Sequence, residues 1–139
     1  MNTVDNCILL NLHKDYTNNI TNLNYKSTVP FEVQRIYYLY GIPETQDRGA
    51  HAHKELFQLL LAASGSFNVE LDDGKNKKKI FLNSPSKGLL IVPGIWRNLT
   101  NFSFGSVVLV LASEYYTETD YIRNYGEFLK YRKINELGI

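Results

Sequence analysis

The sequence predicts an all-β protein, an antiparallel sandwich or barrel with one short helix near the C-terminal end. Apolar runs are short and rich in β-branched and aromatic residues, and turn residues separate them at close spacing. One late stretch alone has helical periodicity. Closely spaced strands of this kind favour antiparallel pairing over an α/β arrangement. A length of 139 residues corresponds to one ordinary domain, so we expect residues 1–139 to form a single unit.

Turn residues mark the ends of the predicted strands. Pro30 precedes one strand, Ser64-Gly65 separates two others, and Asp72-Asp73-Gly74 is typical of a hairpin turn. Pro93-Gly94 ends a further strand, and residues 106–113 contain the most continuous apolar run. In chain order, we predict strands at residues 7–12, 31–40, 55–63, 66–71, 79–82, 89–92 and 106–113.

The predicted helix lies in the C-terminal stretch. Tyr121, Tyr125, Phe128 and Leu129 follow the i, i+4, i+7, i+8 spacing of one helix face. Asp120 stands just before them, and aspartate is a preferred N-cap residue. We therefore predict a short helix that begins after Asp120.

Composition disfavours several classes of function. The chain has 15 Lys and Arg against 14 Asp and Glu, whereas a general nucleic-acid binder carries a large basic excess. No run of about 18 apolar residues is present, so no membrane span is predicted. The start of the chain lacks the features of a signal peptide, and the lone Cys7 can form neither an internal disulfide nor a multi-cysteine zinc site. We therefore expect a cytoplasmic protein.

The segment Arg48-Gly49-Ala50-His51-Ala52-His53 holds two of the three histidines. In an extended strand, residues i and i+2 project from the same face, so the two imidazoles should point the same way. Such a pair can bind a metal ion or share acid–base work, although a surface pair beside a loop is about as common. The apolar residues that follow, among them Leu56 and Phe57, favour a position inside the mouth of a barrel.

Two further segments place polar or aromatic residues where they could face a site. Pro93-Gly94 makes a tight bend that puts Trp96 and Arg97 at the start of the next strand. The alternatives are a core aromatic residue and a solvated charge at the rim. Arg35 and Tyr37 share strand parity and hence a face, although tyrosine is also common on half-buried strands.

Together these segments resemble the two cupin motifs and, more closely, one cupin subfamily, the dTDP-4-keto-6-deoxyglucose 3,4-ketoisomerases. That family supplies 3-amino sugars for bacterial surface glycans such as lipopolysaccharide. The resemblance implies a jelly-roll cupin fold and a homodimer in which the N-terminal strand region, residues 1–29, is exchanged. It covers residues 30–131, and the matching residues are Arg35-Ile36-Tyr37-Tyr38, Arg48-Gly49-Ala50-His51-Ala52-His53-Lys54, Gly65-Ser66, Trp96-Arg97, and residues 109–116 and 120–125.

The metal-binding pattern of cupins is incomplete in this chain. A metal-binding cupin places a carboxylate shortly after the second histidine, where this chain has Phe57 and Gln58, and a third histidine where it has Arg97. A guanidinium would repel a divalent cation, and two histidines alone hold zinc or iron poorly. We therefore expect no metal and no other cofactor, in agreement with the metal-independent activity that the resemblance implies.

The reaction that the resemblance implies moves a ketone from C4 to C3 of the sugar through an enediol. It needs a general base of near-neutral pKa and hydrogen-bond donors to the sugar oxygens. We expect His51 to be the principal base and His53 to be a second acid–base or oxygen-polarising group. Tyr37 is expected to donate to a sugar oxygen or to shuttle a proton.

The dTDP group carries a diphosphate, for which guanidinium groups are the expected donors. Arg35 and Arg48 are the best candidates from their strand and motif positions. Gln58 is expected to contact the sugar, and Trp96 or a tyrosine to stack on thymine.

Arg97 is assigned to substrate binding. It cannot act as an acid at ordinary pH, so arginine in place of histidine there should change the route of protonation. It resembles the family members that make the 3-keto-6-deoxyglucose product. Thr17, within residues 15–18, resembles neither product type, so both gluco and galacto products stay open.

Other functions compete with this assignment. A metal-dependent cupin dioxygenase is disfavoured by Phe57, Gln58 and Arg97. A non-catalytic cupin that binds sugar nucleotides, a structural or regulatory cupin, and an epimerase acting on the same 4-keto sugar are the remaining alternatives.

Overall fold

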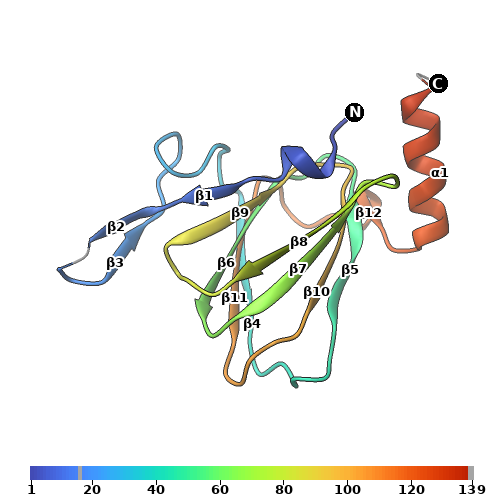
Figure 1. Ribbon diagram of the computed structural model, residues 1–139. Helices are drawn as coiled ribbons and strands as arrows, with labels where there is room; N and C mark the ends of the chain where they lie inside the picture. Colours follow the sequence, from blue (N-terminus) through green and yellow to red (C-terminus); the bar gives the residue numbers. More distant parts are fainter. Residues whose placement is uncertain (16, 138–139) are drawn as a thin grey trace.

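The computed structural model of the protein describes residues 1–15 and 17–137, and for residues 13–15 the backbone alone. The described residues form two five-stranded antiparallel sheets that face each other, which confirms the predicted all-β sandwich (Figure 1). The first sheet has the order β1 (Leu9–Asn11), β9 (Lys87–Ile91), β6 (Gln58–Ser64), β11 (Val107–Ala112), β4 (Arg35–Leu39). The second has the order β12 (Tyr121–Ile122), β5 (Arg48–His53), β10 (Trp96–Thr100), β7 (Phe67–Asp72), β8 (Lys77–Leu82).

Successive strands cross repeatedly between the two sheets. The chain passes from β4 to β5 to β6, and later from β9 to β10 to β11, changing sheet at each step. This crossing pattern agrees with the jelly roll expected from the resemblance. It also sets β5 and β10 of the second sheet opposite β4 and β6 of the first, so that polar residues from all four strands can meet in the interior.

Apolar side chains fill most of the space between the sheets. Phe67, Val69 and Leu71 alternate along β7 and are fully or almost fully buried. Leu60 of β6 and Val110 of β11 are buried in the same cluster. The period-two alternation gives each strand one apolar face, and these faces form the core.

Each predicted strand is present, with its ends shifted by a few residues. The strand predicted at residues 7–12 is β1, which follows a short 3-10 helix, η1 (Val4–Asn6), and pairs with β9 of the same chain. The strands β2 (His13–Asp15) and β3 (Ile20–Asn22) were not predicted, because their stretch is polar; they form an arm that projects from the sandwich (Figure 1). Of residues 15–18, which the sequence linked to the choice of product, Tyr16 lies outside the described residues.

The prediction for the start of the C-terminal helix was wrong. Residues 121–122 form β12, which pairs with β5, and α1 (Tyr125–Glu136) begins only afterwards. The side chain of Asn124, not Asp120, caps α1 by accepting a hydrogen bond from the backbone N–H of Glu127 at 3.0 Å. The reason is that pairing with β5 satisfies the backbone groups that a helix would have satisfied internally.

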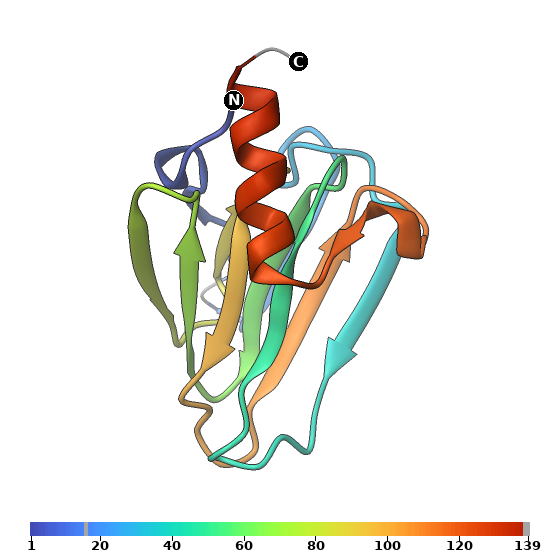
Figure 2. The ribbon, with the colours of Figure 1, turned by 90° about the vertical axis from the view of Figure 1, so that its right-hand side faces the viewer.

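Helix α1 lies across the outer face of the second sheet (Figure 2). Phe128 is fully buried there, in a small cluster with Ala52 of β5 and Ile122 of β12. In the part of the chain that the structure describes, no helix is both long and apolar enough to cross a membrane.

Candidate active site

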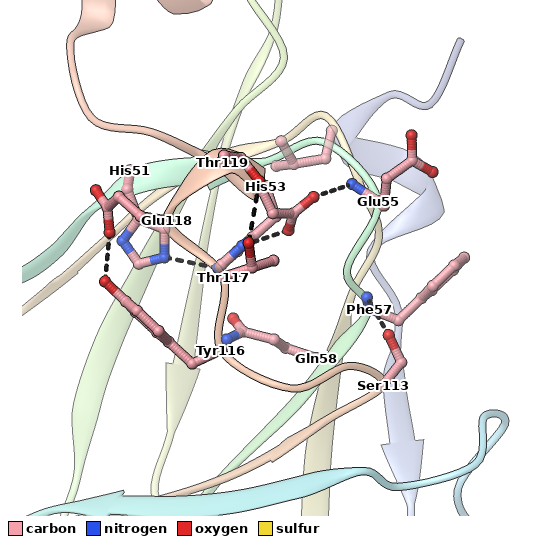
Figure 3. A network of polar contacts seen from close by, with 12 residues as sticks. His51, His53, Glu55, Phe57, Gln58, Ser113, Tyr116, Thr117, Glu118 and Thr119 are labelled. Atoms are coloured by element: carbon pink, nitrogen blue, oxygen red, sulfur yellow. Dashed lines mark hydrogen bonds and ion pairs between the residues drawn. The ribbon is translucent and has the colours of Figure 1, made fainter.

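The two histidines of β5 lie side by side inside the sandwich. The Nε2 atoms of His51 and His53 are 3.0 Å apart (Figure 3), and the ring planes are perpendicular. His53 is fully buried, and His51 is half-buried. The prediction that the two imidazoles point the same way is confirmed.

A β-bulge in β5 adjusts the residues that precede the histidines. His51 lies opposite Arg97 of β10, and Arg48 lies opposite Leu99. The two pairs are three residues apart on β5 but only two residues apart on β10, so β5 contains one extra residue. Gly49, in the bulge, has a φ of 80°, a conformation that glycine adopts at little cost. Because directly opposed residues project to the same side, the bulge returns the half-buried Arg48 to the face that carries His51.

Asp120 reaches the histidine pair from a distant part of the chain. It ends the 3-10 turn η2 (Glu118–Asp120), directly before β12, and the pairing of β12 with β5 brings it to His53. Its Oδ2 is 2.9 Å from Nδ1 of His53, and its Oδ1 accepts a hydrogen bond from the backbone N–H of Glu55 at 2.8 Å. The sequence placed Asp120 at a helix cap and missed this contact, since no local pattern links residues this far apart in the chain.

Arg97 lies in the interior and not at a solvated rim. Only 1% of it is exposed, and its Nη1 donates to Oε1 of Gln58 at 2.6 Å. Its Nε and Nη2 donate to the backbone carbonyl of Ile95 at 3.3 and 3.1 Å. Gln58 in turn donates from Nε2 to the hydroxyl of Tyr37 at 2.9 Å.

Gln58 is placed differently from the sequence expectation. It is 2% exposed, and both ends of its amide face protein groups, Arg97 on one side and Tyr37 on the other. The side chain is therefore positioned to orient these two residues, and its contact with a sugar stays a prediction.

The electrostatic environment keeps both imidazoles uncharged. Burial and the positive charge of Arg97 lower the pKa of His51 to about 3, although a backbone hydrogen bond at Gly49 acts in the opposite direction. Burial and Arg97 lower the pKa of His53 as well. At neutral pH each ring is therefore neutral and has one nitrogen lone pair that can accept a proton. Burial raises the pKa of Tyr37, so its hydroxyl stays protonated and can donate.

Arg35 presents an unsatisfied guanidinium to the same interior. Its Nε and Nη2 are buried and have no hydrogen-bond partner. The group lies 4.9 Å from the ring centre of Tyr37 and 5.6 Å from that of Tyr116. Because Arg35 and Gln58 both lie opposite Ala112 of β11, they project to the same side of the first sheet. A buried cation with free donors is suited to binding an anion.

Tyr121 and its neighbours border the histidine pair. The ring centre of Tyr121 is 5.0 Å from that of His51 and 4.3 Å from that of His53. Arg123 stacks over Tyr121 at 4.1 Å and pairs with Glu118, which also contacts the hydroxyl of Tyr116. The sequence assigned Tyr121 to a helix face, so its contact with the site was missed.

Trp96 does not lie with the histidines but on the other face of β10, where it packs against α1. It precedes Arg97 on β10 and therefore projects to the opposite face, against α1. Its ring centre is 5.3 Å from that of Tyr125 and 5.6 Å from that of Phe128. The predicted stacking of Trp96 on thymine stays a prediction.

Among the described residues, no group of three or more His, Cys, Asp or Glu side chains is arranged to hold a metal ion. The positions of two missing cupin ligands are taken by Gln58 and Arg97, which bond to each other.

The fold and the buried histidine pair define a cupin-type protein with acid–base groups in its interior. A family model described as "WxcM-like, C-terminal" matches residues 5–133. Because this match spans nearly the whole chain, the chain belongs to that family.

Several relatives of 39–47% identity are named as sugar 3,4-ketoisomerases. A TDP-4-oxo-6-deoxy-alpha-D-glucose-3,4-oxoisomerase from Aneurinibacillus thermoaerophilus is 43% identical over 122 residues, which cover 87% of this chain and 88% of the relative. The solved TDP-quinovose 3,4-ketoisomerase from Campylobacter jejuni is 47% identical, with a TM-score of 0.84 over 90% of this chain and 98% of that chain. The 3,4-ketoisomerase from Thermoanaerobacterium thermosaccharolyticum, solved in complex with TDP, is 39% identical, with a TM-score of 0.90 over 96% and 98%. These findings confirm the resemblance and place the chain among the isomerases.

Proposed function

We propose that the chain is a nucleotide-sugar 3,4-ketoisomerase that converts dTDP-4-keto-6-deoxyglucose to a dTDP-3-keto-6-deoxyhexose. The observation that carries this proposal is the pair of neutral imidazoles, whose Nε2 atoms converge beside a buried cation and a tyrosine hydroxyl. A proton leaves C3, an enediol forms, and a proton reaches C4; the oxygen at C3 loses its proton and the oxygen at C4 gains one. The net reaction is an isomerisation and needs acid–base groups only.

We assign His51 as the principal base. It is the half-buried member of the pair, so a bound sugar can reach it, whereas His53 is fully buried. His53 then acts as the second acid–base group, since the 3.0 Å contact between the Nε2 atoms allows a proton to pass.

The oxygens of the enediol need donors and positive charge. Gln58 donates to the oxygen of Tyr37, which leaves the hydroxyl hydrogen of Tyr37 free to point toward a sugar oxygen. The guanidinium of Arg97 is held by protein groups and supplies a fixed positive charge as negative charge develops on the enediol.

We assign Arg35 and Arg48 to the diphosphate of the nucleotide. Arg35 has two buried nitrogen atoms without partners, and a phosphate oxygen would satisfy them. The bulge places Arg48 on the same face of β5 as His51, so both arginines can flank a ligand whose sugar reaches the histidines.

We propose that the reaction proceeds without a metal. The buried Arg97 stands close enough to the histidines to lower the pKa of both, and a cation that disfavours a proton on them also disfavours a divalent metal. A dioxygenase of the metal-dependent cupin type is accordingly disfavoured.

The product carries a ketone at C3, which is the group that a transaminase converts to an amine. We therefore place the reaction before an amination that yields a 3-amino-3,6-dideoxy sugar for a surface glycan. The configuration at C4, gluco or galacto, depends on the face from which C4 is protonated.

The deciding experiment is NMR of the nucleotide sugar after incubation with the purified protein in D₂O. We expect a 3-keto product with deuterium at C4, and in a parallel reaction in H₂O the coupling of the proton at C4 to the proton at C5 assigns its configuration. A product that keeps its ketone at C4 but is inverted at another carbon would instead identify an epimerase. A sugar nucleotide that binds without reacting would identify a non-catalytic cupin.

The roles of the histidines are tested by the variants His51→Asn and His53→Asn. Each should slow the exchange of the C3 proton with deuterated solvent. If both variants exchange this proton at the wild-type rate, the assignment of the histidines is wrong.

We also propose that the protein is a homodimer with exchanged N-terminal strands. Two features support association: β1 and β4 are the edge strands of the first sheet, and Ile36, Tyr38 and Tyr40, on and just after β4, are 61%, 59% and 70% exposed. Within one chain β1 pairs with β9, so the proposal that this strand is exchanged rests on the family resemblance alone. Edge strands and exposed apolar side chains favour association with another copy. Light scattering should give twice the chain mass, and a monomer at micromolar concentration would contradict the proposal.

A further inference from the structure

Nδ1 of His53 is held by a hydrogen-bond acceptor, and His51 has a backbone hydrogen bond at Gly49. Nδ1 of His53 is 2.9 Å from the carboxylate of Asp120, which can only accept, so the proton of the neutral ring belongs on Nδ1. Nε2 of His51 faces His53, so Nδ1 is the ring nitrogen left for the backbone hydrogen bond at Gly49, and we assign the proton of this ring to Nδ1. Each neutral ring thus carries its proton on Nδ1, and both Nε2 atoms are left bare.

The bare Nε2 atoms face each other at 3.0 Å. Two lone pairs at this distance repel, whereas one proton between them converts the contact into an N–H···N hydrogen bond. Uptake of a single proton by the pair therefore completes an unbroken series of hydrogen bonds from Gly49 through both rings to Asp120.

We propose that Asp120 is a positioning residue, which holds His53 in the Nδ1–H tautomer so that His51 and His53 accept one proton jointly between their Nε2 atoms. The inference rests on the proposed function, in which that proton comes from C3 of the sugar. Asp120 is 6% exposed and lies behind His53, so it acts through the imidazole and not on the substrate.

The orientation of the Asp120 carboxylate is fixed by the backbone around it. Oδ1 accepts from the N–H of Glu55 at 2.8 Å, and the backbone carbonyl of Asp120 accepts from the N–H of Lys54 at 3.0 Å. Because Oδ1 is already engaged, Oδ2 is the atom left for His53.

The surrounding charges explain why a carboxylate is needed here. The arginines that disfavour a proton on the pair are Arg35 on β4, Arg97 on β10 and Arg123 between β12 and α1. The exposed Glu118 opposes them at His51. Asp120 supplies a negative charge in direct contact, so that a proton arriving between the rings is stabilised. The ionisable groups that face the pair are Arg35 and Tyr37 on β4, Arg97 on β10, Glu118 and Asp120 on η2, Tyr121 on β12, and Arg123.

The decisive variant is Asp120→Asn. Its amide oxygen should stay on the N–H of Glu55, which turns the NH₂ group toward Nδ1 of His53 and forces that ring into the Nε2–H tautomer. Long-range ¹H–¹⁵N NMR of the imidazoles should then show His53 protonated at Nδ1 in the wild-type protein and at Nε2 in the variant. In the isomerase assay we expect kcat to fall by about 100-fold or more, with KM unchanged.

Two further variants separate positioning from a general structural role. Asp120→Glu keeps the carboxylate and should restore the Nδ1–H tautomer and part of kcat. Glu114→Gln removes an exposed carboxylate from the stretch that connects β11 to η2. This control should leave the tautomer of His53 and kcat as in the wild-type protein.

The NMR measurement needs no substrate, so it tests the inference even if the wild-type protein turns over no keto sugar, a result that would reject the proposed function instead. The inference is overturned if His53 carries its proton on Nε2 in the wild-type protein. It is also overturned if Asp120→Asn changes neither the tautomer nor kcat. Should Asp120→Asn fail to fold by thermal melting, the wild-type and Asp120→Glu spectra still decide.

Discussion

Arg97 donates a hydrogen bond of 2.6 Å to Gln58, and this contact joins β10 of the second sheet to β6 of the first inside the sandwich. A guanidinium that is only 1% exposed would be costly without such partners. The same contact fixes which end of the Gln58 amide faces Tyr37. One buried cation thus sets both the charge near the histidines and the orientation of a hydroxyl donor.

Replacing Arg97 should move the pH dependence of catalysis. Arg97 lowers the pKa of both histidines, so Arg97→Met should shift the acid limb of kcat/KM to higher pH. A pH–rate profile measures this shift, with the exposed Lys133→Gln as the control for loss of a distant positive charge. An acid limb that stays in place would show that Arg97 does not tune the pair.

Loss of Arg35 should weaken nucleotide binding without loss of stability. Its Nε and Nη2 are buried and unpartnered, so Arg35→Gln removes an unpaired charge from the apo protein but also removes donors to the diphosphate. We expect calorimetry to show at least a tenfold weaker affinity for TDP, about 1.4 kcal/mol. Arg35→Lys, which keeps the charge, should lose less, and wild-type affinity in Arg35→Gln would reject the assignment.

Trp96 should matter for stability and not for the nucleotide. It packs between β10 and α1 against Tyr125 and Phe128, so Trp96→Ala should lower the free energy of unfolding by about 2–3 kcal/mol. The dissociation constant for TDP should stay within twofold, about the error of the titration. Phe104→Ala, at a residue that is 90% exposed, is the control for loss of an aromatic ring. A large loss of TDP affinity in Trp96→Ala would restore the stacking role.

Acid should destabilise the fold through the histidines. The pKa of His51 is about 3 in the folded protein and 6.5 ordinarily, so the unfolded chain takes up the proton first as pH falls. The stabilising contribution is therefore complete above about pH 6.5 and is lost progressively below it, toward pH 3. Denaturant titrations should show a decline in unfolding free energy below neutral pH that is smaller in His51→Asn. Equal declines in the two proteins would contradict the lowered pKa.

Much of the sandwich could be predicted from local pattern. The apolar runs and the turn residues between them located the ends of strands such as β7 and β11 to within one or two residues. This was possible because the side-chain period of a strand is fixed by its geometry. The same period predicted that His51 and His53 share a face. The family resemblance was predictable too, since it depends on residue order alone.

Other parts of the site depended on contacts between distant segments. Asp120 was predicted as a helix cap because its neighbours fit a helical period, yet pairing of β12 with β5 placed it against His53. Tyr121 became a neighbour of the histidines for the same reason.

The sequence by itself determined the positions of most strands of the two sheets, the shared face of the two histidines and the family. The tertiary structure decided that Trp96 faces α1 while Arg97 faces the interior, and that a bulge at Gly49 returns Arg48 to the face of His51. The physical reason is that alternation fixes only which residues share a face. Which face is buried, and what lies opposite it, is set by the packing of two sheets whose strands come from distant parts of the chain.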